Sequence, residues 1–363
     1  MSIQLFEWNT YDYAAVCIVP TPSIDASGIA HLVEHLVFRY SDKYPNGHEL
    51  FVANTILPTK INASTQDDYT LFYVVSADSE VFLNCLDYLA HGINQLNYPE
   101  QCIQLERDGV LQRELQWLES QSDYLTEAKT NRVNPSCVHA GGYSDLIPHN
   151  SLSDVRLYKQ TCYLASHRQW LINGKEIEQA ELAFIDDTAT FMTGPRTNTC
   201  STNRYDTQKL PKVIQDLLAA AIPAGHTHEL LQSLREQLTQ TLMTRHIQPT
   251  QTSIQPVHFK NQPIPSECLS NQLSQLAQTC FPHISTDHIP PLPKFILGQI
   301  QKHPELLSGK PCEHITLFKL DLLDIEHISQ AKFWQKRLQG NCYSMGVGYF
   351  EGHIYQYLFA ENR

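Results

Sequence analysis

The sequence has none of the features of a nucleic-acid-binding or membrane-spanning protein. Its 363 residues include 26 lysines and arginines but 38 aspartates and glutamates, which gives a formal net charge of −12. A negatively charged chain without a basic stripe is repelled by the phosphate backbone, so we do not expect nucleic acid as a partner. No apolar run approaches the roughly 20 residues that span a bilayer, so we expect no membrane as a partner either.

The sequence also lacks an export signal and a cysteine framework. The N-terminus, "MSIQLFEWNTYDY", has no basic region followed by an apolar stretch, which predicts the absence of a signal peptide. The ten cysteines are scattered without a Cys-x-x-Cys pair. This pattern favours reduced thiols over disulfides or a cysteine-ligated zinc site. Together these observations predict a cytoplasmic location.

What the sequence does contain is a mixture of strand and helix patterns. Apolar and β-branched runs predict strands at Ala14–Val19 and Tyr69–Val75. Helical periodicity predicts a long helix over 100–121. A chain of this length can form two domains with well-buried cores. We therefore predict an α+β fold.

A polar stretch at 196–211, "RTNTCSTNRYDTQKLP", has no apolar period and is interpreted as a linker. It divides an N-terminal domain, 1–195, from a C-terminal domain, 212–363. In the second domain the pattern predicts a helix at Ile328–Leu338 and a glycine-punctuated hairpin at Tyr343–Tyr357.

An apolar helix at 28–38, "GIAHLVEHLVF", is interrupted by three ionisable residues. His31 and His35 are four residues apart and share one helix face, where two imidazoles can bind one cation. Glu34 can reach a water on that cation. Zinc lowers the pKa of such a water toward about 7, so that a neighbouring carboxylate can take its proton. The order His-x-x-Glu-His is that of the inverzincins.

The same three residues also have a simpler interpretation. The histidines can be satisfied helix residues, and Glu34 can be a solvated charge. The apolar neighbours argue against it, because burying three ionisable groups without a shared partner is costly. A shared metal ion removes that conflict.

A catalytic zinc ion needs a third protein ligand and an open fourth position. The acidic segment "LERDGVLQRELQWLES" supplies the candidates. Glu114 borders the apolar face that contains Leu111 and Leu115. Glu106 lies near that side and could hydrogen-bond a ligand histidine. An ordinary surface charge is the alternative interpretation of Glu106.

The chain up to about residue 175 resembles the M16 (pitrilysin or insulinase-like) zinc metallopeptidases. "GVLQREL" is similar to a segment of the presequence-protease branch, which implies that Glu114 is the third zinc ligand. In the family a further glutamate usually precedes that ligand by seven residues, whereas residue 107 is arginine here and the corresponding acid is Glu106. The other matching segments are "GIAHLVEHLVFRYSDKYP", "INASTQDDYTLFYVVSADSEVF" and "LSDVRLYKQTCY".

The second half resembles the family in one segment, "KRLQGNCYSMG". Arg337 and Tyr343 have the spacing of a family pair that assists catalysis, and the resemblance implies that they hold the scissile carbonyl and its oxyanion. The resemblance also implies two M16-type α/β sandwich domains, each a mainly antiparallel sheet packed by helices. The second domain is expected to be abbreviated, because few residues follow Tyr343.

The resemblance implies a zinc-dependent endopeptidase with one Zn²⁺ per chain, which we expect to be held by His31, His35 and Glu114, with Glu34 as general base. The substrate is expected to be an unstructured peptide, such as a leader or precursor peptide. It would add as a strand to the edge of the active-site sheet. The matching residues are Asn62, Ala63, Ser64 and Thr65.

Two further expectations concern partners. A complete family chamber needs more domains than this chain holds, so we expect a homodimer or a heterodimer with another M16-like subunit. The alternative to an enzyme is a catalytically silent M16-like subunit that binds peptides or assists a partner. The presence of His31, Glu34, His35 and Glu114 together favours the enzyme.

Overall fold

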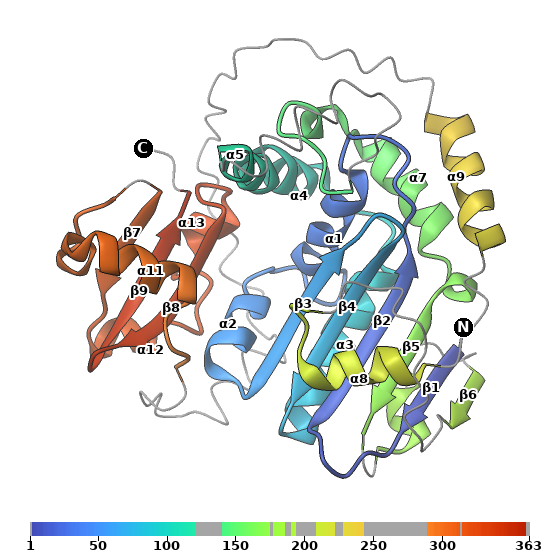
Figure 1. The fold of residues 1–363 in the computed structure, drawn as a ribbon, viewed down its shortest axis with the longest axis horizontal. Helices are drawn as coiled ribbons and strands as arrows, with labels where there is room; N and C mark the ends of the chain where they lie inside the picture. Colours follow the sequence, from blue (N-terminus) through green and yellow to red (C-terminus); the bar gives the residue numbers. More distant parts are fainter. Residues whose placement is uncertain are drawn as a thin grey trace.

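The computed structural model describes residues 2–120, 140–174, 177–185, 190–193, 208–221, 228–242, 289–312 and 314–360. Two bodies are visible in Figure 1. The N-terminal body comprises the described residues up to 242, and the C-terminal unit comprises those from 289 to 360. The predicted linker at 196–211 lies mostly outside the described residues. Among the described helices, none has both the length and the apolar character that crossing a membrane requires.

The N-terminal body is built on a six-stranded sheet in the order β3-β4-β2-β5-β1-β6. Four neighbouring strands, β3, β4, β2 and β5, pair antiparallel, whereas β1 pairs parallel with both β5 and β6. β3 therefore lies at one edge of this sheet. The strands are β1 (Ser2–Phe6), β2 (Tyr13–Pro20), β3 (Thr59–Thr65), β4 (Tyr69–Ser76), β5 (Gln169–Asn173) and β6 (Thr190–Thr193).

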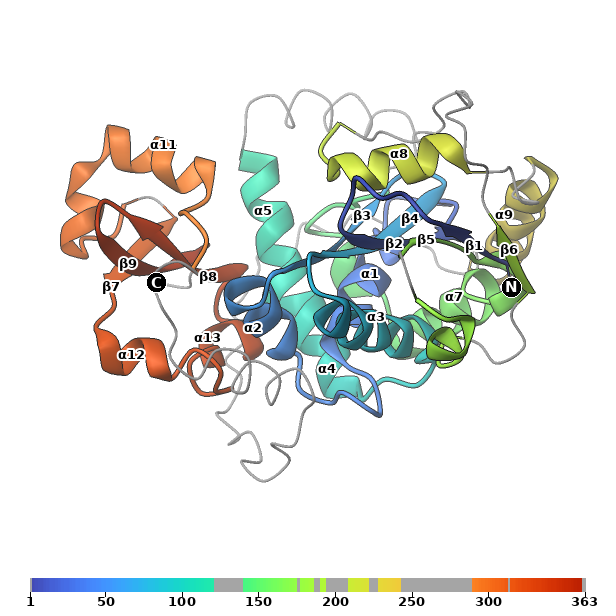
Figure 2. The ribbon, with the colours of Figure 1, turned by 90° about the horizontal axis from the view of Figure 1, so that it is seen from below.

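One face of the sheet is covered by helices that carry the candidate site. Figure 2 shows α1, α3 and α7 on this side and α8 on the other. Leu32 and Leu36 of α1 are fully buried in the core between these helices and the sheet. The elements on this side include α1 (Ile29–Arg39), α2 (Glu49–Ile56), α3 (Ser79–Asn94), α4 (Glu100–Gln104), a π-helix (Leu105–Leu111), α5 (Gln112–Ser120) and α7 (Leu152–Cys162). Short 3-10 turns lie at Ile147–His149, Ala165–His167 and Gln179–Leu182.

The opposite face is covered by α8 (Lys212–Ala220), and α9 (His228–Leu242) packs against α7. Leu217 of α8 is fully buried in a cluster with Val16 of β2 and Leu171 of β5. The assignment of 212–242 to the C-terminal domain is therefore corrected. A polar stretch in the sequence does not reveal that the next amphipathic helix packs back onto the preceding sheet.

The C-terminal unit contains a three-stranded antiparallel sheet in the order β7-β9-β8. The predicted hairpin at Tyr343–Tyr357 corresponds to β8 and β9. The predicted helix at Ile328–Leu338 is wrong over most of its length, because only Gln335–Leu338 is helical. The elements are α11 (Lys294–Lys302), a 3-10 turn (Pro304–Ser308), β7 (Ile315–Lys319), α12 (Leu322–Glu326), α13 (Gln335–Leu338), β8 (Ser344–Phe350) and β9 (His353–Phe359).

Trp334 explains why that helix does not form. Its indole Nε1 donates to the carbonyl of Ile328 at 2.7 Å, and its fully buried ring stacks on Phe51 of α2 at 5.3 Å between centroids. The ring thus joins the C-terminal unit to the N-terminal body. The α+β class is confirmed, and the sheet of the second body has three strands where the first has six.

The packing of α8 predicts a large effect for one truncation. Leu217→Ala should lower the free energy of unfolding of the N-terminal body by about 2–5 kcal/mol, because it removes a fully buried side chain. Urea denaturation measures this change. Leu323→Ala is the matched control, since Leu323 is 67% exposed and its truncation should change stability by less than about 0.5 kcal/mol. Equal effects would contradict the placement of α8.

Candidate metal centre

The helix α1 begins at a backbone turn that only glycine adopts readily. Gly28 has φ +66°, and a Cβ there would lie 2.7 Å from the carbonyl oxygen of Gly141. The chain 140–142 therefore packs directly against the start of the helix. His31, one turn later, donates from its Nδ1 to that same Gly141 carbonyl at 3.2 Å.

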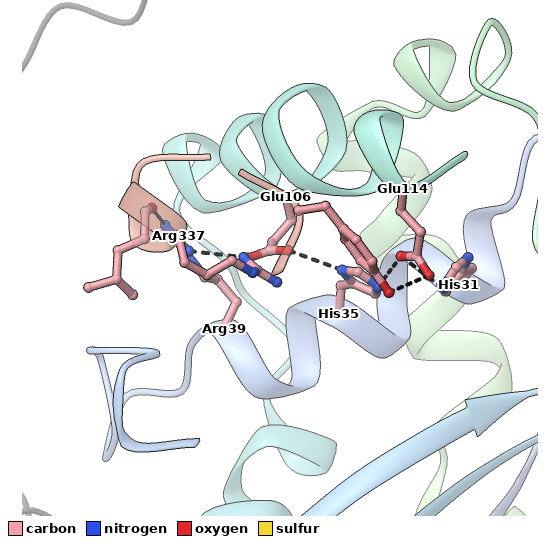
Figure 3. A network of polar contacts seen from close by, with 8 residues as sticks. His31, His35, Arg39, Glu106, Glu114 and Arg337 are labelled. Atoms are coloured by element: carbon pink, nitrogen blue, oxygen red, sulfur yellow. Dashed lines mark hydrogen bonds and ion pairs between the residues drawn. The ribbon is translucent and has the colours of Figure 1, made fainter. Parts of the chain in front are cut away.

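The second helix of the site contains a π-helical segment at Leu105–Leu111. Glu106 and Glu114 are eight residues apart, which in a regular α-helix places them about 80° apart around the axis. The backbone hydrogen bonds of a π-helix span one residue more than those of an α-helix, i→i+5 instead of i→i+4. The π-helical segment therefore accommodates the eight-residue separation, and both carboxylates reach α1 (Figure 3). This explains how Glu106 takes the position behind His35 although residue 107 is arginine.

Three potential ligands converge between these helices. One ligand atom from each of His31, His35 and Glu114 lies within 4.8 Å of the others. Glu114 Oε2 is 3.4 Å from His35 Nε2 and 3.8 Å from His31 Nε2. Two ligands bound to zinc at about 2.0–2.2 Å in a tetrahedron are separated by roughly 3.4 Å. The spacing therefore fits a shared zinc ion.

The hydrogen bonds of the two Nδ1 atoms determine which ring nitrogens face Glu114 as acceptors. His35 Nδ1 lies 3.1 Å from Glu106 Oε2, and His31 Nδ1 lies 3.2 Å from the Gly141 carbonyl. Because these oxygens only accept, each Nδ1 carries the proton, and in a neutral ring Nε2 is then an acceptor. Glu114 Oε2 is buried and makes no hydrogen bond. Three acceptors facing one another require a cation or an added proton between them.

The electrostatics of these side chains agree with this view. Burial alone would lower the pKa of His35, but the Glu106 and Glu114 carboxylates outweigh it and raise the pKa to about 10. Burial alone would raise the pKa of Glu114, but the charges of His31 and His35 and the Tyr343 hydroxyl lower it to about 2. Without a metal ion, a proton on His35 thus takes the cation's role.

Glu34 lies beside this cluster and lines a cavity of about 220 Å³. Its Oε2 accepts a hydrogen bond from the hydroxyl of Thr65 on β3. Asn62, on the same edge strand, lines the cavity, and Ala63 packs partly buried against the core. Ser64 is half-buried and pairs with Leu71 of β4. The structure thus brings β3 to the site, while peptide binding by these four residues stays a prediction.

Arg337 and Tyr343 reach the site from the C-terminal unit of the same chain. The Tyr343 hydroxyl donates to Glu114 Oε1 at 2.8 Å, and Arg337 Nη1 donates to Glu106 Oε1 at 3.1 Å. Burial, together with the nearby Glu114 carboxylate, raises the pKa of Tyr343 well above its usual value. Tyr343 thus contacts a candidate ligand and Arg337 contacts the carboxylate behind His35, where the resemblance implied contact with substrate.

Arg39 is the residue of the site that sequence reasoning missed. It is 9% exposed, and its Nη1 donates to Glu106 Oε1 at 3.2 Å beside Arg337 (Figure 3). The signal was present, because Arg39 follows His35 by four residues and therefore lies on the same face of α1. Because a cation at the end of an amphipathic helix usually faces solvent, sequence reasoning did not place Arg39 in the site.

Residues 23–135 match the family "Insulinase (Peptidase family M16)". Over these residues the chain matches peptidase family M16. An uncharacterised protein of Caenorhabditis elegans is 30% identical in an alignment of 226 residues that covers 51% of this chain and 23% of that protein. The mitochondrial presequence protease of Eremothecium gossypii is 24% identical in an alignment of 186 residues that covers 46% of this chain and 19% of that protein. A probable mitochondrial-processing peptidase subunit beta of Arabidopsis thaliana is 34% identical in an alignment of 148 residues that covers 40% of this chain and 27% of that protein.

The chain spans less than a third of the length of these curated relatives. Among solved structures, pitrilysin matches with a TM-score of 0.41 and 20% identity, over 50% of this chain and 21% of its own. The periplasmic protease PqqL of Escherichia coli matches with a TM-score of 0.42 and 15% identity, over 51% of this chain and 22% of its own.

The ligand set predicts which histidine the metal depends on. His31→Ala should abolish tight zinc binding, because two remaining side chains are too few for a stable site. Zinc content after dialysis measures this. His303→Ala is the control, since His303 belongs to a separate and more exposed group with Glu305 and Cys312. Retention of zinc by His31→Ala with loss in His303→Ala would move the centre to the C-terminal unit.

The raised pKa of His35 predicts proton release on metal binding. At pH 8 the metal-free His35 carries a proton, because its pKa is about 10, and a metal ion can bind Nε2 only after that proton leaves. Zinc titration calorimetry in two buffers of different ionisation enthalpy should detect about one proton released. Below the unfolded pKa of about 6.5 the proton stabilises the metal-free fold fully, and this stabilisation is lost as the pH rises through about 10. Zinc uptake without proton release would contradict the assignment.

Proposed function

We propose that this chain is a zinc-dependent endopeptidase that cleaves unstructured peptides. The observation that carries the proposal is the convergence of His31, His35 and Glu114, with Glu34 one helical position away beside a cavity. A zinc ion held there would polarise the scissile carbonyl and lower the pKa of a water. The match of residues 23–135 to a peptidase family supports the same reading.

Glu34 is the group best placed to accept the proton of an attacking water. It is adjacent in sequence to His35 and, like His35, lines the cavity. The Thr65 hydroxyl holds one of its oxygens. The other oxygen is left to act as a general base. Glu34 can then pass that proton to the leaving amine.

The edge strand β3 gives a peptide a place to bind. Its residues pair with β4 on one side only. On the other side the Asn54 amide bonds the backbone of Ile61, so an extended peptide can pair through backbone hydrogen bonds with the part of the strand that follows Ile61. Asn62 and Thr65 on this strand lie at the cavity and at Glu34. A peptide paired there passes close to the general base, which favours extended over folded substrates.

Tyr343 can serve a developing oxyanion only by changing partner. A phenol has a single O–H to donate, and in this structure it donates to Glu114. We infer that substrate binding shifts this hydroxyl toward the carbonyl oxygen, and that Arg337 remains with Glu106. In this proposal Tyr343 contacts the oxyanion, whereas Arg337 contacts Glu106 and not the substrate.

The oligomeric state and the alternative role of a silent subunit are further proposals. One relative is named as a subunit of a processing peptidase, which supports a homodimer or a heterodimer with another M16-like subunit, or a silent subunit that binds peptide. The structure needs no second chain to bring Arg337 and Tyr343 to the candidate centre. A cytoplasmic location also stays a prediction.

The general-base assignment predicts that a change at Glu34 abolishes peptide cleavage without affecting zinc binding. Glu34→Gln should retain zinc and lower kcat for a fluorogenic peptide library by at least about 10²-fold, because the amide cannot take a proton. Glu229→Gln on the exposed surface of α9 is the matched control and should keep the parent's activity. Unchanged cleavage by Glu34→Gln would remove Glu34 from catalysis. Absence of cleavage by the zinc-loaded parent would favour the silent subunit.

A further inference from the structure

The C-terminal unit contacts both carboxylates of the candidate metal centre. Arg337 donates to Glu106, which lies behind His35, and Tyr343 donates to Glu114, which faces both imidazoles. These contacts join residues more than two hundred positions apart in the chain. The centre is therefore shared between the two bodies.

The two oxygens of each carboxylate have different partners. Glu106 Oε1 accepts from Arg39 and Arg337, and Oε2 contacts His35 Nδ1. Glu114 Oε1 accepts from Tyr343, and Oε2 faces the two imidazoles without a hydrogen bond. In each case the contact from the C-terminal unit fixes one oxygen and so orients the other toward a histidine. Partners of this kind set the orientation of a ligand and its affinity for metal.

Docking itself depends on a close backbone contact between two glycines. A Cβ added to Gly109, in the π-helix, would lie 2.8 Å from Gly340 Cα, and a Cβ on Gly340 would lie 2.9 Å from Gly109 Cα. The same crossing is held by Arg113 Nε, which donates to the Gly340 carbonyl at 3.1 Å, and by Arg39, which donates to the Leu338 carbonyl. Any side chain at Gly109 would therefore force the bodies apart without altering a charged or ligating group.

We propose that docking of the C-terminal unit completes the metal centre, so that zinc binding and docking strengthen each other. The inference rests on the zinc site of the proposed function, and it makes Arg337, Tyr343 and Arg39 positioning residues for His35 and Glu114. Coupling between two binding events is reciprocal. Whatever factor docking adds to the zinc affinity, zinc must add to the docking equilibrium.

The sharpest test is Gly109→Ala in the full chain. Zinc affinity, measured by competition with a chromogenic chelator at pH 7.5, should fall by about tenfold or more, in the range seen when partners of metal ligands are removed. Gly298→Ala is the matched control, because it makes the same change within a helix of the C-terminal unit where a Cβ would meet nothing within 4 Å. Equal affinity of Gly109→Ala and parent, with the unit shown to be displaced, would overturn the proposal.

A second pair of variants tests the contacts without adding bulk. Arg337→Gln with Tyr343→Phe removes both hydrogen bonds to the carboxylates and should weaken zinc binding by about tenfold or more. Lys332→Gln with Tyr349→Phe removes the same charge and hydroxyl from exposed positions of the unit and should leave affinity unchanged. If the first pair binds zinc as the parent does, the proposal is wrong.

Hydrogen exchange supplies the reciprocal measurement. Zinc should slow exchange of backbone amides in α13 and β8 of the parent by the same factor by which docking raises zinc affinity. The effect should vanish in Gly109→Ala. Zinc binding to the parent without protection of these amides would overturn the coupling.

The two hypotheses can fail separately. If the parent cleaves peptides, and Gly109→Ala and the double variant Arg337→Gln with Tyr343→Phe bind zinc as tightly as the parent, the proposed function stands and the coupling is wrong. If the variants weaken zinc binding but the parent cleaves no peptide, the coupling stands and the peptidase function is wrong.

Discussion

Glu106 is a buried and Glu114 a half-buried carboxylate on one helix, and their charges are satisfied by groups from α1 and from the C-terminal unit. A buried charge is tolerated only when it is paired and hydrogen-bonded. Glu106 is 2% exposed and contacts Arg39, His35 and Arg337. Glu114 contacts the histidines of α1 and the Tyr343 hydroxyl. The positions of α1, the π-helix and the C-terminal unit are therefore tied to these two side chains.

The π-helical segment is the local feature that makes this possible. Such segments are rare in helices and occur often at functional sites. Here it brings two carboxylates eight residues apart onto one side, and it places Gly109 where the backbone of Gly340 can approach. One irregular stretch thus sets both the ligand geometry and the contact between the two bodies.

The sheet contributes in a different way. Its core strands are buried and fixed by pairing on both sides, whereas β3 is paired on one side only. The same strand carries Thr65, whose hydroxyl holds Glu34. In the proposed function, peptide binding at β3 and the orientation of Glu34 would therefore be linked through one short strand.

Much of the site was predictable from local spacing. The separation of His31 and His35 by four residues decides that they share a helix face, whatever the helix packs against. Alternation and β-branching were enough to find β4 and the β8–β9 hairpin, because these patterns arise from the pleat itself. Local pattern failed where packing decided the outcome, as for α8, which returns to the first sheet, and for 328–334, where the Trp334 side chain replaces a helix with turns.

The sequence by itself determined that two imidazoles and a carboxylate interrupt one apolar helix, since helix periodicity is a local property. The tertiary structure alone decided that Glu106 serves His35, that Arg39 points inward and that Arg337 and Tyr343 meet the same centre. These contacts depend on where distant helices cross and on a π-helical turn. Both are set by the packing of the whole chain and leave no periodic trace in the sequence.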